Sequence, residues 1–364
     1  MMYSRKLYIS TNSTCNLECI YCFENAKKPF AFDVEGAVEV ILKQLQTTTE
    51  HGTQISLRGG EPFLLFDKIK ELCERVWSEN ISEYYHFHIT TNGTLIHGNI
   101  KKWLYEHRSQ ISIKLSLDGD KISSDINRPN SFDRIDLPFF ANTWSGLKVN
   151  MTVTSQTLPF LFRNVVFIHS VGAKHILTHF SIMTDWEKCH LEKVLYEQLR
   201  LLSQYYLQKP TIEPCSLFDK DISLTLSEPC RLPCNCNQIQ AYDFQTKKYY
   251  PCYMCFPSIG GEKVSEVFAQ IDFTADSMED ECCLHCPFIN LCITCYAENY
   301  ITRGALSHRD MALCPYQKVT FAALFEFEYN RIIRQKDVTA EDINKMKAIQ
   351  KWYPEIRKIV LALV

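Results

Sequence analysis

Residues 6–22 read KLYISTNSTCNLECIYC, a short alternating apolar run followed at once by a loop that carries three cysteines. Cys15, Cys19 and Cys22 are so close in sequence that one loop can present all three sulfurs to one bound group. Thiolates select zinc or iron–sulfur clusters. A 4Fe–4S cluster normally takes four cysteines, and a set of three would leave one iron open, as a catalytic zinc keeps an open position. A zinc loop or a chance group of cysteines is the alternative.

The bulk composition excludes several classes of protein. The chain has 364 residues, of which 46% are hydrophobic and 22% charged, and its net charge is −3, so we expect a globular protein with no nucleic-acid or membrane partner. It has no apolar run of about 18 residues and no signal peptide at its start, which predicts a cytoplasmic location. The 17 cysteines in such a long, leaderless chain favour metal binding over a disulfide scaffold.

The first half of the sequence alternates strand patterns with helical patterns, which predicts parallel β/α units. A helix is predicted over 33–46, with Asp33 as its N-cap. The predicted strands are 6–10, 54–58, 85–90, 111–117, 147–154 and 175–182.

These strand patterns have one apolar and one polar face. Ile113 and Leu115 alternate with Ser112 and Lys114, and residues 85–92 and 149–154 alternate in the same way. Parallel strands are usually apolar on both faces, and a closed eight-stranded barrel is packed with branched side chains. We therefore predict an α/β fold with a partial (β/α)6 TIM-like barrel, in which the polar face lines a ligand cavity. A sheet with one solvated face is the alternative.

The spacing Cys15-x3-Cys19-x2-Cys22, with Tyr21 before the last cysteine, resembles the signature of the radical S-adenosylmethionine (SAM) superfamily. The resemblance covers roughly residues 5–205. It implies a 4Fe–4S cluster whose open iron binds SAM. Reduction would then cleave SAM to methionine and a 5′-deoxyadenosyl radical, which abstracts a hydrogen atom from the substrate.

Further motifs carry the same resemblance. Gly59-Gly60-Glu61-Pro62 matches the family's GGEP loop, which contacts the methionine amino group; glycine permits close approach, and a carboxylate suits an ammonium. In the family stretch that resembles Ser116-Leu-Asp118-Gly, the serine lies near the ribose, and the arginine matching Arg128 pairs with the methionine carboxylate. The positions thus expected to bind SAM are Tyr21, Gly59, Gly60, Glu61, Pro62, Thr90, Asn92, Ser116, Asp118, Arg128 and Thr152.

Cysteines are dense again in the second half of the sequence. The run Cys283-x2-Cys286-x5-Cys292-x2-Cys295, followed by Cys314, resembles the SPASM domain of radical enzymes that modify peptides. The resemblance implies two auxiliary 4Fe–4S clusters. The outer set would be Cys283, Cys286, Cys292 and Cys314, and the inner set Cys230, Cys236, Cys252 and Cys295. Cys234 can replace Cys236, Cys255 can replace Cys252, and a single auxiliary cluster or zinc remains open.

Three domains are predicted: the barrel (1–207), the SPASM domain (208–315) and C-terminal helices (316–364). In the last, Thr339-Ala-Glu-Asp342 resembles a capping box.

The resemblance implies an enzyme that abstracts a hydrogen from a ribosomally made precursor peptide and forms a side-chain crosslink through carbon, sulfur or oxygen. Peptide epimerisation and anaerobic sulfatase maturation, which makes formylglycine, are the alternatives. Sulfatase-maturing enzymes carry an Asp base after the cysteine equivalent to Cys252, where this chain has Tyr253. The unperturbed pKa of Tyr is about 10, which disfavours that reading. A non-enzymatic electron carrier would leave the GGEP loop and Arg128 unexplained.

The catalytic residue is not identified by the sequence, and the candidates are Tyr253, Cys255, Asp243, His86 and His88. A reductase with flavodoxin or ferredoxin is expected as the electron donor, and the enzyme is expected to be oxygen-sensitive. Many peptide-maturing relatives carry an N-terminal leader-binding domain. The residues before the first predicted strand are too few for one, so we expect a separate leader-binding protein, or direct reading of the peptide by the barrel and C-terminal helices.

Overall fold

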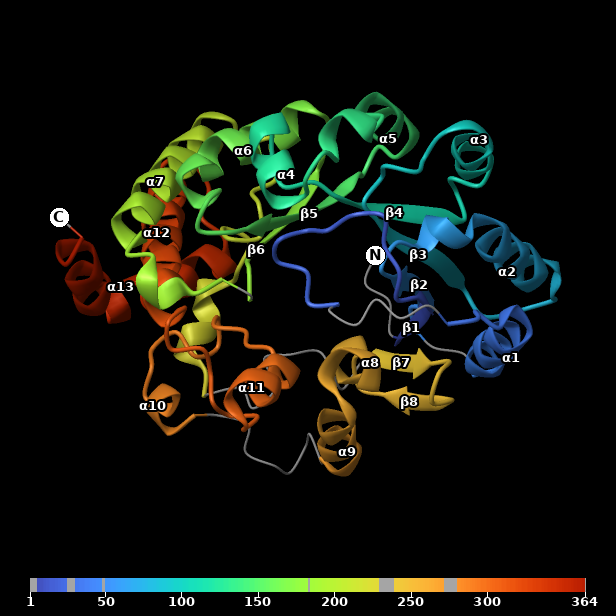
Figure 1. Ribbon diagram of the computed structural model, residues 1–364. Helices are drawn as coiled ribbons and strands as arrows, with labels where there is room; N and C mark the ends of the chain where they lie inside the picture. The colour runs from blue at the N-terminus through green and yellow to red at the C-terminus, as the bar shows by residue number, and fades with distance from the viewer. Residues whose placement is uncertain are drawn as a thin grey trace. The chain divides into compact units, whose positions relative to one another are not determined.

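The computed structural model describes residues 5–24, 30–47, 50–182, 184–228, 239–271 and 280–363. The chain forms two compact units, whose elements are labelled in Figure 1. Unit 1 comprises Met1–Leu117, Arg128–Asn150 and Asn235–Asp272, and unit 2 comprises Asp118–Asn127, Met151–Cys234 and Phe273–Val364.

The strands form an open, largely parallel sheet. They are β1 (Arg5–Asn12), β2 (Thr53–Gly59), β3 (Tyr85–Thr91), β4 (Ile111–Ser116), β5 (Lys148–Val153), β6 (His175–Phe180), β7 (Ile239–Asp243) and β8 (Lys248–Tyr250). Their order is β6-β5-β4-β3-β2-β1-β7-β8. Strands β1 to β5 and β7 pair in parallel, and β8 pairs antiparallel with β7. The predicted partial barrel and its six strands are confirmed.

The helices of unit 1 flank its strands (Figure 1). They are α1 (Val34–Leu45), α2 (Phe66–Ser78), α3 (Gly98–Glu106), α5 (Leu137–Thr143), α8 (Pro257–Gly260) and α9 (Glu262–Gln270), with 3-10 turns η1 (Pro62–Leu65), η2 (Phe132–Arg134) and η7 (Tyr253–Cys255). The Asp33 side chain accepts a hydrogen bond from the Gly36 backbone N–H and caps α1 as predicted. On β4, Ile113 and Leu115 are buried, whereas Ser112 and Lys114 on the other face are half-buried.

Unit 2 is mostly helical. Its helices are α4 (Lys121–Asn127), α6 (Leu161–Ser170), α7 (Glu192–Gln208), α10 (Glu281–Leu284), α11 (Tyr296–Arg303), α12 (Cys314–Ile332) and α13 (Ala340–Leu361), and its 3-10 turns are η3 (Leu158–Phe160), η4 (Trp186–Lys188) and η5 (Ile222–Leu226). The capping box at the start of α13 is confirmed, because the Thr339 and Asp342 side chains each bond the other's backbone N–H. Across the described ranges, the helices are too short or too polar to span a bilayer.

The β7–β8 hairpin was not anticipated. It lies in a segment where the sequence shows little periodicity, yet β7 pairs in parallel with β1, from Lys6↔Ile239 to Ile9↔Tyr242. Asp243 helps to close the hairpin, because its carboxylate accepts a hydrogen bond from Thr246 Oγ1 (2.8 Å) and one from the Gln245 backbone N–H (3.2 Å). A strand this short is stabilised by its pairing with β1, and it contains too few residues to show a clear alternating pattern in the sequence.

The predicted domain boundaries at 207 and 315 stay a prediction.

Candidate functional site

The cysteine loop follows β1 in unit 1. Cys15, Cys19 and Cys22 are all half-buried, and a turn from the Cys22 backbone N–H to the Cys19 carbonyl (3.1 Å) fixes the second half of the loop. Leu17 is buried, and its backbone N–H points at Cys15 Sγ at 3.4 Å. The loop therefore folds locally around its own sulfurs.

Two side chains from distant parts of unit 1 approach these sulfurs. Asn92 Nδ2 lies 3.8 Å from Cys15 Sγ, and Arg128 Nη1 lies 3.8 Å from Cys19 Sγ. Burial raises the pKa of Cys15; the Leu17 N–H lowers it, and the nearby Glu61 carboxylate raises it further. Hydrogen-bond donors beside thiolate ligands are a common means of tuning an iron–sulfur cluster.

Within the ranges that the structure covers, no three His, Cys, Asp or Glu side chains converge closely enough to hold one metal ion. A closed zinc site would need its sulfurs about 2.3 Å from a single ion.

The predicted GGEP loop packs against the backbone that leads into Cys15. The Gly60 N–H donates to the Asn12 carbonyl (3.1 Å), and the Glu61 N–H donates to the Thr14 carbonyl (2.8 Å). A Cβ atom on Gly60 would lie 2.1 Å from the Thr14 carbonyl oxygen. Glycine is thus required here for close approach of two backbones.

Glu61 is fully buried, and both of its carboxylate oxygens are engaged. Oε2 accepts from the Asn92 N–H (2.8 Å), and Oε1 accepts from Thr91 Oγ1 (2.8 Å) and the Phe63 N–H (3.1 Å). Burial raises the pKa of this carboxyl to about 6, although these donors and Arg128 oppose the shift. Glu61 therefore orders the end of β3, and its predicted contact with the methionine amino group stays a prediction.

A polar network continues from the end of β3 into the cysteine loop. Asn92 Oδ1 accepts from Thr94 Oγ1 (2.7 Å), and Asn92 Nδ2 donates to Asn16 Oδ1 (2.9 Å). Asn16 Nδ2 in turn donates to Thr94 Oγ1 (2.8 Å). Asn16 and Thr94 were missed by sequence reasoning, although Asn16 directly follows the first cysteine of the motif.

The other predicted SAM-binding residues divide between the units. In unit 1, Arg128 is buried with its guanidinium 5.2 Å from the Tyr21 ring centre, and Ser116 is buried at the end of β4. In unit 2, the Asp118 carboxylate accepts from the Thr152 N–H (2.8 Å) and from Asn127 Nδ2 (3.3 Å). The Asp118 contacts connect α4 with the strand residue Thr152, and a cofactor role for this pair stays a prediction.

Tyr253 lies within an aromatic group of unit 1. Its ring lies 5.9 Å from the Tyr8 ring and 5.8 Å from the Phe23 ring. The Arg58 guanidinium lies 4.5 Å from the Tyr253 ring centre and 4.8 Å from that of Tyr8. Sequence reasoning missed Arg58 because it resembles an ordinary polar residue of a strand.

The side chain of Cys255, another candidate catalytic residue, is fully buried.

The predicted outer cysteine set lies together in unit 2. Burial raises the pKa of Cys292, and the nearby Cys314 and Cys286 thiols raise it further, while Arg309 and Lys220 lower it. The pKa of Cys283 is raised by burial first, with Cys292 among the further causes. Arg309 Nη1 also donates to the Cys292 carbonyl (2.7 Å). Two cations thus lie beside this group of thiols.

The predicted inner set stays untested. Cys230, Cys236 and the alternative Cys234 fall outside the described residues. Cys252 belongs to unit 1 and Cys295 to unit 2.

Part of the chain is similar to known proteins. Residues 9–136 match the model of the Radical SAM superfamily. Uncharacterized protein MJ0907 of Methanocaldococcus jannaschii is 28% identical over 196 residues, which are 51% of this chain and 65% of that protein. The Cysteine-type anaerobic sulfatase-maturating enzyme of Clostridium novyi is 30% identical over 139 residues, 34% of this chain and 36% of that protein. The chain thus spans less than two thirds of either relative.

Solved structures match over more of the chain. A histidine-tagged form of anSMEcpe with bound AdoMet aligns over 94% of this chain and 98% of that one, with a TM-score of 0.67 and 20% identity. Streptococcus suis SuiB bound to precursor peptide SuiA aligns over 85% of this chain and 76% of that one, with a TM-score of 0.57 and 18% identity. These matches show a shared fold.

Proposed function

We propose, from the premise that residues 9–136 are a radical SAM domain, that this protein is an enzyme that cleaves SAM reductively and abstracts a hydrogen atom from a peptide. The observation that carries the proposal is the single loop of Cys15, Cys19 and Cys22 after β1. Asn92 and Arg128 direct donors at two of its sulfurs.

The residues present fit a 4Fe–4S cluster with SAM. Thiolates are the ligands that such clusters take, and the glycines at 59 and 60 let the GGEP loop approach the cysteine loop closely. When bound, the cluster and SAM would supply a 5′-deoxyadenosyl radical that removes a hydrogen atom from the substrate. Cys15, Cys19 and Cys22 would hold the cluster.

The surrounding side chains would bind and orient SAM. Arg128 is a buried guanidinium, which suits bidentate pairing with the methionine carboxylate. Glu61 keeps the GGEP loop and the end of β3 together through its hydrogen bonds. Ser116 is a buried hydroxyl at the end of β4, which suits a ribose contact.

We assign a ribosomally made precursor peptide as the substrate and a side-chain crosslink as the product. Two proteins with this fold support a peptide substrate: SuiB has been solved with precursor peptide SuiA, and anSMEcpe with AdoMet and the Cp18Cys peptide. The cysteines of the outer set would hold one auxiliary 4Fe–4S cluster and those of the inner set a second. A flavodoxin or ferredoxin would supply electrons.

Formylglycine formation on a sulfatase is the second candidate, because several relatives are named as anaerobic sulfatase-maturating enzymes. Tyr253 stands where those enzymes are expected to carry an Asp base. In this chain the Tyr253 ring faces the Arg58 guanidinium. The absence of a carboxylate at this position disfavours the sulfatase reaction, because a tyrosine with an ordinary pKa of about 10 is a weak general base.

The test is a mass change in a precursor peptide encoded beside the gene, after incubation with anaerobically reconstituted enzyme, SAM and reductant. Loss of two hydrogen atoms, located by fragmentation, supports a crosslink. An aldehyde at Cys or Ser would instead establish the sulfatase-type reaction. Deuterium uptake without a mass change in ordinary water would establish epimerisation.

A further inference from the structure

A row of basic side chains crosses the polar face of the unit 1 sheet. Lys114 on β4 pairs directly with Lys148 on β5 and, on its other side, with Thr90 on β3. The pairing of β2 with β3 runs to Leu57↔Ile89, so Arg58 and Thr90 are the next residues along these two strands. Arg58 pairs with Ser10 of β1. We call Arg58, Lys114 and Lys148 the cation row.

No carboxylate of the described chain neutralises this row. Lys114 and Lys148 form no ion pair with any described residue, although like charges at paired positions of adjacent strands are destabilising. Arg58 contacts the rings of Tyr8 and Tyr253, and its charge interacts with these two phenols and with the Cys252 thiol rather than with a carboxylate. The row is therefore a local excess of positive charge.

The groups around Lys114 increase this excess. The charges of Arg58 on β2, Lys148 on β5 and Lys6 on β1 repel the Lys114 ammonium. His86 and His88 of β3 lie on the same face of the sheet. Burial, followed by the neighbouring cations, lowers the pKa of Lys114 to about 7. The same causes hold the pKa of His88 well below its ordinary value. A bound anion would reverse the electrostatic part of these shifts.

The row lies just inside the predicted SAM site. Arg58, Thr90 and Lys114 each precede, by two positions, a residue that the family resemblance assigns to SAM: Gly60, Asn92 and Ser116. Two residues along a parallel strand span about 6.6 Å. In the same row, Thr90 Oγ1 is buried without a hydrogen-bond partner among the described residues.

We infer that the cation row binds a carboxylate of the peptide substrate, either an acidic side chain or the C-terminal carboxylate, and so positions a nearby carbon for hydrogen abstraction. The inference rests on the proposed function, which places SAM at the adjoining strand ends. The ammonium groups of Lys114 and Lys148 and the Thr90 hydroxyl would pair with the carboxylate oxygens, and Arg58 would add a third positive charge nearby.

The test is equilibrium binding of short peptides to reconstituted enzyme with SAM but without reductant, measured by calorimetry at pH 6.5. One pair of probes is the acetylated, amidated pentapeptide Gly-Gly-Glu-Gly-Gly and its Gln counterpart. The other pair is acetylated pentaglycine with a free or an amidated C-terminus. We expect the carboxylate member of one pair to bind about tenfold or more tightly than its amide match, and the pair that discriminates identifies the source of the carboxylate.

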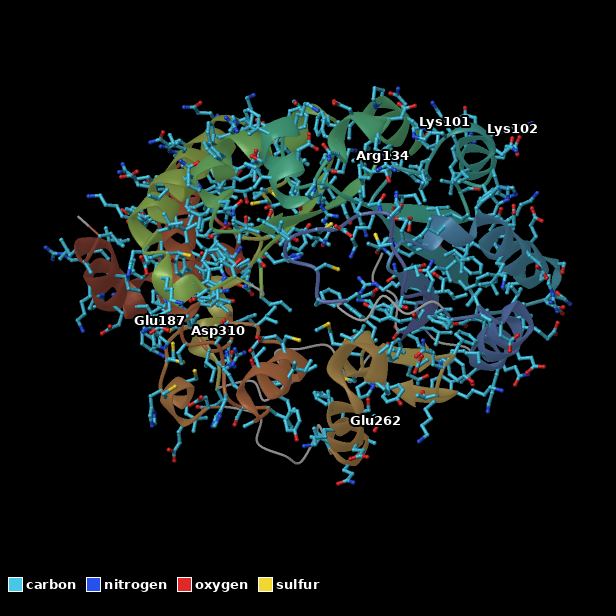
Figure 2. All side chains as sticks on the ribbon, viewed as in Figure 1. Lys101, Lys102, Arg134, Glu187, Glu262 and Asp310 are labelled. Atoms are coloured by element: carbon cyan, nitrogen blue, oxygen red, sulfur yellow. The ribbon has the colours of Figure 1, made fainter. Side chains whose placement is uncertain are left out.

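Substitutions link this binding to the row. Lys114→Gln and Lys148→Gln should each weaken the carboxylate probe about tenfold, while Lys114→Arg should retain most of the affinity. The matched control is Lys102→Gln, an exposed lysine on α3 (Figure 2) that forms an ion pair with Glu106. Unfolding midpoints confirm that each variant is folded. Raising the pH to 8.5 should weaken binding, because Lys114 then loses its proton in the free enzyme.

Equal affinity for the acidic and amide probes in both pairs would overturn the inference, as would unchanged binding in both lysine variants. Formation of 5′-deoxyadenosine under reductant is measured separately. An enzyme that cleaves SAM but does not discriminate between the probes refutes only the carboxylate site, whereas an enzyme that fails to cleave SAM refutes the proposed function.

Discussion

Arg128 combines burial, charge and position at the candidate SAM site. Its guanidinium lies beside the Cys19 sulfur and the Tyr21 ring. A guanidinium can bind a carboxylate through two parallel hydrogen bonds, whereas an ammonium acts as a point charge. We expect Arg128→Lys to raise the KM for SAM by about tenfold or more, with iron and sulfide content unchanged. Steady-state SAM cleavage and a metal assay measure the two quantities.

The matched control for Arg128 is Arg134→Lys, at an exposed arginine of unit 1 labelled in Figure 2. It should leave the KM for SAM unchanged. An unaltered KM in Arg128→Lys itself would mean that Arg128 only packs against Tyr21.

Lys114 also gives a prediction for stability. Its pKa is about 7 in the folded chain, against 10.5 for the ordinary side chain, so between these values the unfolded chain binds more protons and stability rises with pH. Replacing Lys114 by Met should therefore raise the free energy of unfolding at pH 7. We expect on the order of 2 kcal/mol, discounted for partial exposure.

This gain should shrink as the pH approaches 10, where wild-type Lys114 no longer carries a penalty. Urea unfolding at the two pH values, with Lys102→Met as the control, measures the difference. Destabilisation by Lys114→Met at both pH values would contradict an unneutralised lysine at this position.

At the scale of elements, the GGEP loop and the cysteine loop form one packed pair. An alanine at position 60 would place its Cβ against the Thr14 carbonyl, next to Cys15, so the cysteine loop would have to shift. We expect Gly60→Ala to lose about four irons per chain, while circular dichroism remains unchanged. Gly146→Ala is the control, because its added Cβ would meet no atom within 4 Å. Full iron content in Gly60→Ala would show that the two loops are not coupled.

The N-terminus of α13 offers an independent test in unit 2. Thr339→Ala should lower the free energy of unfolding by about 1 kcal/mol through loss of the cap. Burial would raise the pKa of Asp342, but hydrogen bonds from Thr339 and Arg331 outweigh it and lower that pKa to about 2. The contribution of Asp342 is thus present above pH 4 and lost as the pH falls toward 2. An equal effect of Thr339→Ala at pH 7 and pH 2 would argue against this coupling.

At the scale of the molecule, the barrel core was predictable because apolar residues alternate along its strands with a period of two. The site motifs were predictable because each lies in the loop directly after a strand. The carboxyl ends of parallel strands meet at one edge. Glu61, Asn92 and Cys15 were therefore expected near one another, and hydrogen bonds now connect them.

The remaining features depend on contacts between distant segments. The β7 strand exists through its pairing with β1, and Asn16 gains its role from Thr94 and Asn92 on another strand end. Arg58 contacts Tyr253, which lies about 200 positions later in the sequence, and only the folded structure brings the two together. The hydrophobic period of one segment does not depend on which distant residues it contacts, so these contacts could not be predicted from a single sequence.

The proposed SAM cleavage is tested most directly by the formation of 5′-deoxyadenosine. The anaerobically reconstituted protein is incubated with SAM and a strong reductant, and the product is quantified by liquid chromatography and mass spectrometry. The wild-type chain should form equal amounts of 5′-deoxyadenosine and methionine, and Cys15→Ala, Cys19→Ala and Cys22→Ala should form neither product. Zinc bound at these three cysteines, together with intact SAM after reduction, would contradict it.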